Sequence, residues 1–175
     1  MKNSDQLEKD AALNIAALMA AAARTAPKTR GIDNIQVISI DDEITRAKII
    51  SKMRDIAKAE NRSSFERDAQ SIAASPVIIA IGVKANPAGL NCGFCGYAAC
   101  AELGKTNGIC SFNSIDLGIA AASAVMIASS FHIDNRLMYS IGRACLDLGL
   151  LGADVQQALG IPLSVTGKNP FFDRK

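Results

Sequence analysis

Four of the five cysteines lie within nineteen residues, and their spacing is the feature that most restricts how this chain can fold. They form the pattern C-x2-C-x4-C-x9-C and are Cys92, Cys95, Cys100 and Cys110. Four thiolates are the ligand set of a cubane iron–sulfur cluster, one for each iron, so the pattern predicts a [4Fe-4S] cluster. Gly93 and Gly96 would let the backbone fold closely around it and direct N–H groups at its sulfurs.

Three other interpretations of these cysteines stay open. Structural zinc also uses four cysteines, but usually as two C-x2-C pairs, and only Cys92 and Cys95 have that spacing. Disulfides need an oxidising compartment, and five cysteines in a chain without an export signal argue against them. Unliganded thiols are the third alternative. Cys145 lies in an apolar stretch and is expected to be a packed small residue rather than a ligand.

The distribution of charge limits the classes of partner. Nineteen basic and seventeen acidic residues give a net charge of +2, and no basic stripe stands out, which argues against nucleic acid. Residues 76–163 hold only four basic and five acidic side chains, so we expect this stretch to be interior or part of a subunit interface. Small residues in one predicted helix would permit close helix–helix approach, namely Gly118, Ala121, Ala122 and Ala128. Together these features predict a homodimer.

Two apolar stretches bear on location. The run from Ala11 to Ala23 follows three acidic residues, where a signal peptide needs net positive charge. The stretch from Leu117 to Ile133 is uncharged but is rich in Ala, Ser and Gly and just short of a usual membrane span, so it predicts a buried central helix. We therefore expect a cytoplasmic protein without a membrane contact.

Hydrophobic periodicity predicts helices and strands that mix without a strict βαβ rhythm. Helices are expected over 5–25, about 43–60, 63–74, about 114–132 and about 135–149, and strands over 35–40, 77–83, 156–164 and, more briefly, 109–112. Capping boxes are expected at Asp5 with Glu8 and at Ser63 with Glu66, and a helix cap at Asn113. The fold class is α+β, one domain over 1–175 with helices on a central sheet and a loop-rich, cysteine-containing insertion at 84–112.

The segment from Asn91 to Cys100 reads Asn-Cys-Gly-Phe-Cys-Gly-Tyr-Ala-Ala-Cys. It resembles the [4Fe-4S] domain of the corrinoid iron–sulfur protein and of the B subunit of membrane ferredoxin–NAD oxidoreductase complexes. Those domains have a longer gap before their fourth cysteine, so Cys110 departs from the pattern.

The rest of the chain resembles the flavin-dependent nitroreductases. The similar segments are Ala22–Pro27 followed by Asn34–Gln36, Ala74–Pro76, Asp116–Ala120 and Leu159–Pro162. The whole arrangement, together with 167–174, resembles a family of uncharacterised ferredoxin-domain proteins from anaerobes. The nitroreductase likeness implies a mostly antiparallel sheet, a homodimer and FMN bound at the dimer interface with its phosphate held by arginines.

That resemblance implies a set of flavin-binding candidates here. They are Arg24, Lys28, Arg30, Asn34, Lys168 and Arg174. The family's R-R-S-x-R phosphate segment is not found, and Lys28 stands where the family has serine. The alternative is that these charges are solvated surface groups. The single histidine, His132, is expected to end or pack beside a helix rather than to act as a base.

Two main functions follow. In the first, an oxidoreductase passes electrons between its cluster and a flavin, with a redox partner protein or small-molecule acceptor completing the circuit. In the second, the chain is a ferredoxin-like electron carrier or redox sensor without catalytic activity. A zinc-stabilised structural protein is a third alternative. No catalytic residue is assigned.

Overall fold

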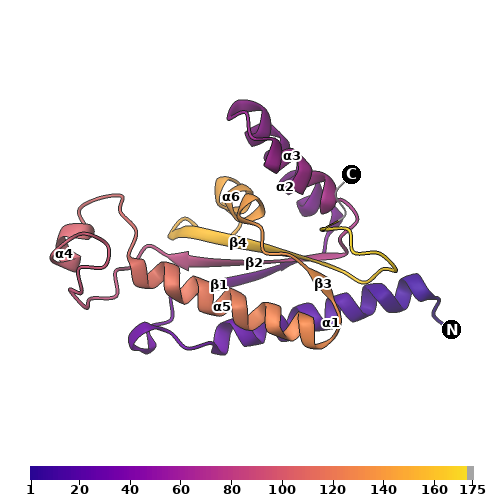
Figure 1. Cartoon of the computed structure of the whole chain (residues 1–175), viewed down its shortest axis with the longest axis horizontal. Helices are drawn as coiled ribbons and strands as arrows, with labels where there is room; N and C mark the ends of the chain where they lie inside the picture. Colours follow the sequence, from indigo (N-terminus) through magenta and orange to yellow (C-terminus); the bar gives the residue numbers. More distant parts are fainter. Residues whose placement is uncertain (173–175) are drawn as a thin grey trace.

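The computed structural model describes residues 1–172, and its centre is one antiparallel sheet of four strands (Figure 1). The strands are β1 (Ile35–Ile40), β2 (Val77–Lys84), β3 (Asp134–Asn135) and β4 (Val155–Ser164), in the order β1-β2-β4-β3. All three pairings are antiparallel. The expected α+β class is therefore confirmed.

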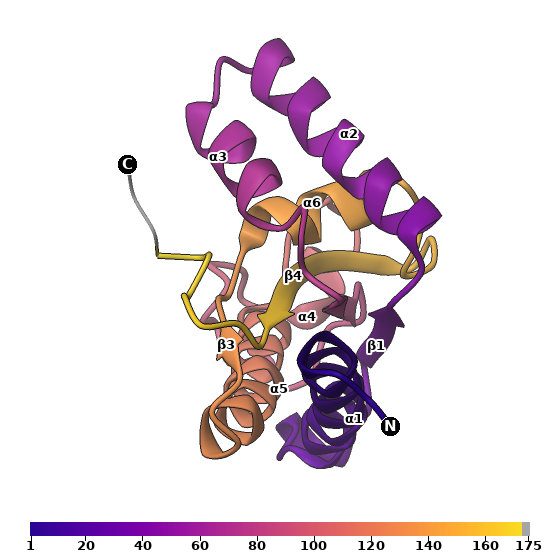
Figure 2. The same ribbon diagram turned by 90° about the vertical axis from the view of Figure 1, so that its right-hand side faces the viewer.

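Helices cover both faces of the sheet, so the molecule has three layers (Figure 2). One face carries α1 (Ser4–Thr25) and α5 (Ser111–Ser130), and the other carries α2 (Glu43–Ala59), α3 (Ser63–Ser71) and α6 (Tyr139–Asp147).

Strand β2 lies between two separate cores. Alternate side chains of a strand point to opposite faces. Val77, Ile79, Ile81 and Val83 accordingly join the core under α1 and α5, while Ile78 and Ala80 join the core under α2, α3 and α6. This explains why the strand is apolar at nearly every position and confirms that it is covered on both faces.

Helix α6 packs closely on β4, and a glycine on each of the two elements makes room for the contact. A Cβ built on Gly142 would lie 1.9 Å from the carbonyl oxygen of Ala158, and one on Gly160 would lie 2.2 Å from Cγ2 of Ile141. Backbone atoms cannot yield to such contacts, so glycine is required at Gly142.

The cysteine segment, residues 85–110, projects from one end of the sheet, between β2 and α5 (Figure 1). It contains the short helix α4 (Cys100–Leu103) and its own small apolar centre of Ala88, Leu103 and Cys110. Partly buried side chains pack around that centre, namely Cys95, Tyr97 and Phe112. The segment is loop-rich, as expected.

The strand expected at 109–112 is not formed, because α5 already begins at Ser111 with Cys110 as its N-cap residue. Asn113 therefore lies within the first turn instead of capping the helix. Its amide group is used elsewhere, since Nδ2 donates to the carbonyl oxygens of Lys84 and Asn86, both at 3.0 Å. A longer-range contact has replaced the local cap.

Other local expectations were also wrong in detail. The first helix is capped by Asn3 and Gln6 rather than by Asp5 and Glu8. The residue before α3 is Arg62, which makes no side-chain cap, so the box at Ser63 is not formed. The helix expected from 135 begins only at Tyr139, because Asp134 and Asn135 pair with β4.

Helix α5 is not buried all round, contrary to expectation. Its inner face, including Ala120, Ala121 and Ala124, lies in the core, whereas Ile115 is 44% and Met126 62% exposed. Among the described helices it alone is long and apolar enough to span a membrane, a test that core helices also pass.

Candidate metal centre

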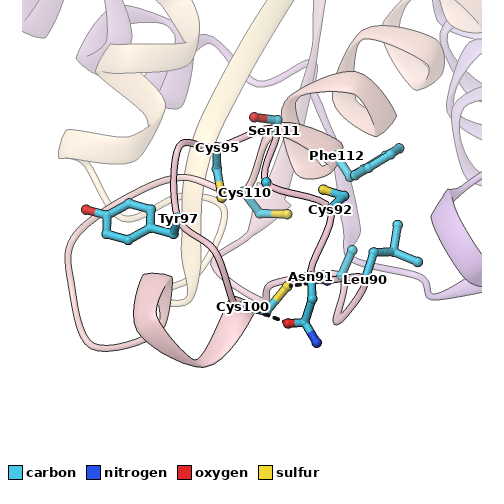
Figure 3. Close-up of a pocket in the computed structure, with 11 residues that line it drawn as sticks. Leu90, Asn91, Cys92, Cys95, Tyr97, Cys100, Cys110, Ser111 and Phe112 are labelled. Atoms are coloured by element: carbon cyan, nitrogen blue, oxygen red, sulfur yellow. Dashed lines mark hydrogen bonds between the residues drawn. The ribbon is translucent and has the colours of Figure 1, made fainter.

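The four clustered cysteines line a single hollow at the end of the sheet (Figure 3). The enclosed space between them is small, about 10 Å³. Cys92 is exposed, Cys95 and Cys100 are half-buried, and Cys110 is buried at the start of α5. The fold thus gathers thiols from both ends of the segment around one space.

The sulfur atoms are not arranged as a coordination shell in this structure. Within residues 1–172, no three His, Cys, Asp or Glu side chains lie close enough together to hold one metal ion. Ligation of a common group by all four thiols would require the segment to rearrange around the hollow.

Glycine conformation shapes the C-x2-C turn. Gly93 and Gly96 have φ of +75° and +85°, which side-chain-bearing residues rarely adopt, and the N–H of Gly96 donates to the carbonyl of Gly93 at 2.9 Å. The two glycines therefore make the tight turn that brings Cys92 and Cys95 to the same hollow.

Asn91 ties the third cysteine to the first pair. The N–H of Cys100 donates to Oδ1 of Asn91 at 2.8 Å, and the N–H of Asn91 lies 3.4 Å from Sγ of Cys100 (Figure 3). Asn91 itself has φ of +48°, a left-handed conformation that asparagine tolerates better than most residues. Backbone N–H groups directed at sulfur are the contacts that stabilise a charged thiolate.

The surroundings fit a group held by four thiolates. Leu90, Tyr97 and Phe112 form apolar walls, and no carboxylate is among the described residues that line the hollow. Phe94 stacks on Phe112 with ring centroids 5.5 Å apart. The N-terminal end of α5 adjoins Cys110, and a helix N-terminus favours negative charge. Cys92, Cys95, Cys100 and Cys110 could hold a [4Fe-4S] cluster, and the same donors suit zinc.

The residues expected to bind flavin lie in different parts of the structure. Arg24 forms an ion pair with Asp33 and also donates to the carbonyl of Ile35. Lys28 donates to the carbonyls of Arg24 and Ala26 and lies 4.0 Å from Asp33. The cations of this loop are thus already engaged with polar groups of their own chain.

The remaining candidates lie in three places. Arg30 donates to the carbonyl of Ala88 at 3.0 Å, in the cysteine segment. Asn34 is buried and exchanges hydrogen bonds with Asn86. Lys168 follows the end of β4 that pairs with Val77, whereas Arg24–Asn34 adjoins the opposite end of the sheet, where Ile35 pairs with Val83. Arg174 lies outside the described residues. Within one chain, the five candidates that the structure describes do not converge.

Two further residues can be placed. Cys145 is fully buried in α6, as predicted, and burial raises the pKa of its thiol to about 12, so it stays protonated. His132 is exposed just after the end of α5, with φ of +57°, while the cysteine hollow lies at the start of that helix. The two residues therefore take no part in the site.

Sequence reasoning missed Asn86 and treated Asn113 only as a helix cap. Both are asparagines in the stretch with few charges. Asn113 lies three residues after Cys110. The available signal was an asparagine close in sequence to a candidate ligand, but its hydrogen-bond partners could not be read from spacing.

The chain is similar to known protein sequences. Residues 106–174 match the family model described as "Uncharacterized protein containing a ferredoxin domain (DUF2148)". A protein of Archaeoglobus fulgidus, itself described as uncharacterized, is 43% identical over an alignment of 176 positions that covers 95% of this chain and 94% of that protein.

Solved structures show a similar fold. A nitroreductase with bound FMN from Desulfitobacterium hafniense has a TM-score of 0.63 at 15% identity, over 96% of this chain and 80% of that one. A BluB-like flavoprotein from Clostridium difficile has a TM-score of 0.60 at 17% identity, over 89% and 81%. At such identities the likeness establishes the nitroreductase-like fold alone, which confirms the expected architecture.

Proposed function

The chain belongs to the family of uncharacterised proteins that contain a ferredoxin domain, and from this premise we propose that it is a [4Fe-4S] redox protein. Cys92, Cys95, Cys100 and Cys110 are the proposed ligands. The observation that carries the proposal is that these four thiols line one hollow, although they come from both ends of an irregular segment. A bound cluster supplies one-electron transfer, which the side chains of this chain cannot perform.

The chain's own residues would hold and shield that group. The thiolates bind it, Asn91 and the two glycines shape the loop around it, and Leu90, Tyr97 and Phe112 exclude water. Cys92 is exposed whereas Cys110 is buried, so electrons would enter and leave on the Cys92 side. The partner is a redox protein or a small-molecule acceptor that approaches this exposed side.

Anaerobic purification and reconstitution test the proposal. We expect a brown protein with broad visible absorbance and about four irons and four sulfides per chain. Serine at Cys92, Cys95, Cys100 or Cys110 should lower the iron content, while Cys145→Ser, a matched change in a buried cysteine outside the hollow, should not. A colourless protein with stoichiometric zinc would refute the proposal and support the structural alternative.

A second candidate function is a flavin-dependent oxidoreductase in which a flavin exchanges electrons with the cluster. The nitroreductase-like fold favours it, since the Desulfitobacterium hafniense structure contains FMN. Its proposed ligands are Arg24, Lys28, Asn34, Lys168 and Arg174. A second copy of the chain would have to bring Lys168 close to Arg24, Lys28 and Asn34, because these residues lie at opposite ends of the sheet in one copy. A yellow cofactor released by heat supports this function, and its absence after growth and purification with FMN favours a carrier or sensor.

We propose that the chain forms a homodimer through the outer face of α5. Exposed residues of this helix form one apolar stripe in which small side chains lie between two large ones, namely Ile115, Gly118, Ala122 and Met126. Water contact with such a stripe is unfavourable, and the small residues permit close approach of a second helix.

A further inference from the structure

Arg30 reaches out of the loop after α1 and lies against the wall of the cysteine hollow. Its Nη1 donates to the carbonyl oxygen of Ala88 at 3.0 Å, and Ala88 lines the hollow. A Cβ added to Gly89 would lie 2.9 Å from the same nitrogen. The guanidinium is therefore packed directly behind the Ala88–Gly89 backbone, 58 residues away in sequence.

The backbone is held in an unfavourable conformation to place this side chain. Arg30 has φ of +57° within the turn η1 (Thr29–Gly31), a left-handed conformation that costs free energy in a residue other than glycine. The turn is fixed by Asp116, which is buried in α5 and accepts hydrogen bonds from the N–H and the hydroxyl of Thr29 at 3.1 and 2.9 Å. Strain that is maintained by such anchoring is characteristic of functional positions.

The charge of Arg30 is the least compensated in its loop. Arg24 and Lys28 both lie beside Asp33, whereas Arg30 forms no ion pair with any residue in the described part of the chain. The hollow in front of it collects four thiols and no carboxylate. A cation behind the Ala88–Gly89 backbone would be attracted by the negative charge that four thiolates bring to the hollow.

From these contacts we infer that Arg30 compensates the charge of the thiolate site and raises the reduction potential of the group bound there. The inference rests on the proposed cluster and assigns Arg30 to it rather than to a flavin phosphate. One-electron reduction by an external reductant adds one negative charge to the site, and a nearby cation stabilises that state more than the oxidised one. Because Arg30 is otherwise exposed, water and salt screen the effect.

Potentiometric titration of reconstituted protein, followed by visible absorbance and electron paramagnetic resonance, tests this. Arg30→Gln keeps a donor for the Ala88 carbonyl but removes the charge. We expect it to reduce the equilibrium constant for one-electron reduction roughly three- to tenfold, where tenfold corresponds to about 59 mV. Arg30→Lys should retain most of the wild-type potential, and the difference between Arg30→Gln and wild type should shrink at 1 M salt.

Two variants serve as controls. Arg54→Gln removes an arginine of α2, on the other face of the sheet, that is paired with Glu66, and it should leave the potential nearly unchanged. Arg30→Gly removes the charge but also relieves the left-handed strain, so it should lower the potential as Arg30→Gln does while stabilising the apoprotein. Comparison of Arg30→Gly with Arg30→Gln therefore separates the effect of the charge from the effect of the strained backbone.

Each outcome decides the question. If wild type takes up no iron or sulfide, the proposed function fails and this inference fails with it. If wild type is loaded and Arg30→Gln has an unchanged potential at low salt, the inference alone is overturned. If Arg30→Gln cannot be loaded but Arg30→Lys can, the positive charge is required. If neither can be loaded, Arg30 holds the loop rather than compensates charge.

Discussion

Asn113 and Asn86 join the first turn of α5 to the beginning of the cysteine segment. Nδ2 of Asn113 donates to the carbonyl oxygen of Asn86 at 3.0 Å and to that of Lys84 at the same distance, while its N–H donates to the carbonyl of Cys110 at 3.0 Å. Asn86 in turn donates from its side chain to Asn34 at 3.3 Å. These contacts fasten both ends of the segment to the sheet and to α5.

Replacing Asn113 should loosen the site and the fold together. Asn113→Ala removes two hydrogen bonds, to the carbonyls of Lys84 and Asn86, and each such bond contributes ~1 kcal/mol even though both carbonyls keep another donor. We expect urea unfolding of the apoprotein to show a loss of about 2 kcal/mol and reconstitution to yield fewer irons per chain. Asn107→Ala, an exposed residue of the same segment, is the control and should change neither. Equal behaviour of the two variants would contradict this role.

Asn91 should control how firmly the segment holds its ligand. Asn91→Gly keeps the left-handed backbone but removes the oxygen that accepts from the N–H of Cys100. Loss of one such hydrogen bond is worth ~1 kcal/mol, so iron release to a chelator should be about fivefold faster. Asn91→Asp retains an acceptor oxygen and should stay close to wild type. Slow release from Asn91→Gly would show that the contact is dispensable.

Cys145 makes folding stability depend on pH. Burial raises the pKa of its thiol from the ordinary value of 9.0 to about 12. Below pH 9 the thiol is protonated in both the folded and the unfolded protein, so it causes no loss of stability. Above it, the unfolded thiol ionises and the folded one does not, so stability falls by about 1.4 kcal/mol per pH unit up to pH 12. Urea unfolding of wild type and Cys145→Ala between pH 8 and 10.5 checks this, since the variant should lack that component of the slope. Parallel slopes would contradict the prediction.

Met126 tests the proposed dimer. It is 62% exposed on the stripe of α5, and Met126→Glu would place a charge where a second copy packs, so we expect a shift from dimer to monomer in sedimentation. Ile44→Glu is the matched control, because Ile44 is 72% exposed on α2, on the other face of the sheet. A wild-type protein that sediments as a monomer, or equal effects of the two changes, would exclude this interface.

The helices and long strands could be predicted because their signals are local. The alternation over Ile35–Ile40 and the continuous apolar run of β2 lie at the predicted positions. Helix starts were less predictable. Asp42 caps α2 through the N–H of Thr45, whereas the side chain of Asn113 binds distant carbonyls instead of capping α5. Local propensity is overridden where a buried polar group needs a partner.

The site was predictable only in part for the same reason. The spacing of the cysteines and the glycines of the turn are visible in sequence, and these thiols do line one hollow. The polar groups that hold the segment in place come from residues 27 to 87 positions away, as with Asn113 and Lys84 or Thr29 and Asp116. Such pairings follow from the sheet order, which no spacing rule contains.

Sequence alone determined the identity of the donor set, four thiols within one glycine-containing segment, and the elements of the scaffold around it. Both depend on neighbouring residues, whose preferences act over a few positions of chain. The tertiary structure decided that Arg30 lies behind the hollow while Lys168 lies at the opposite end of the sheet. Antiparallel pairing of β1 with β2 brings Asn34 beside Lys84, so the loop before β1 meets the segment after β2. Contacts between such distant residues form only when the whole sheet is assembled.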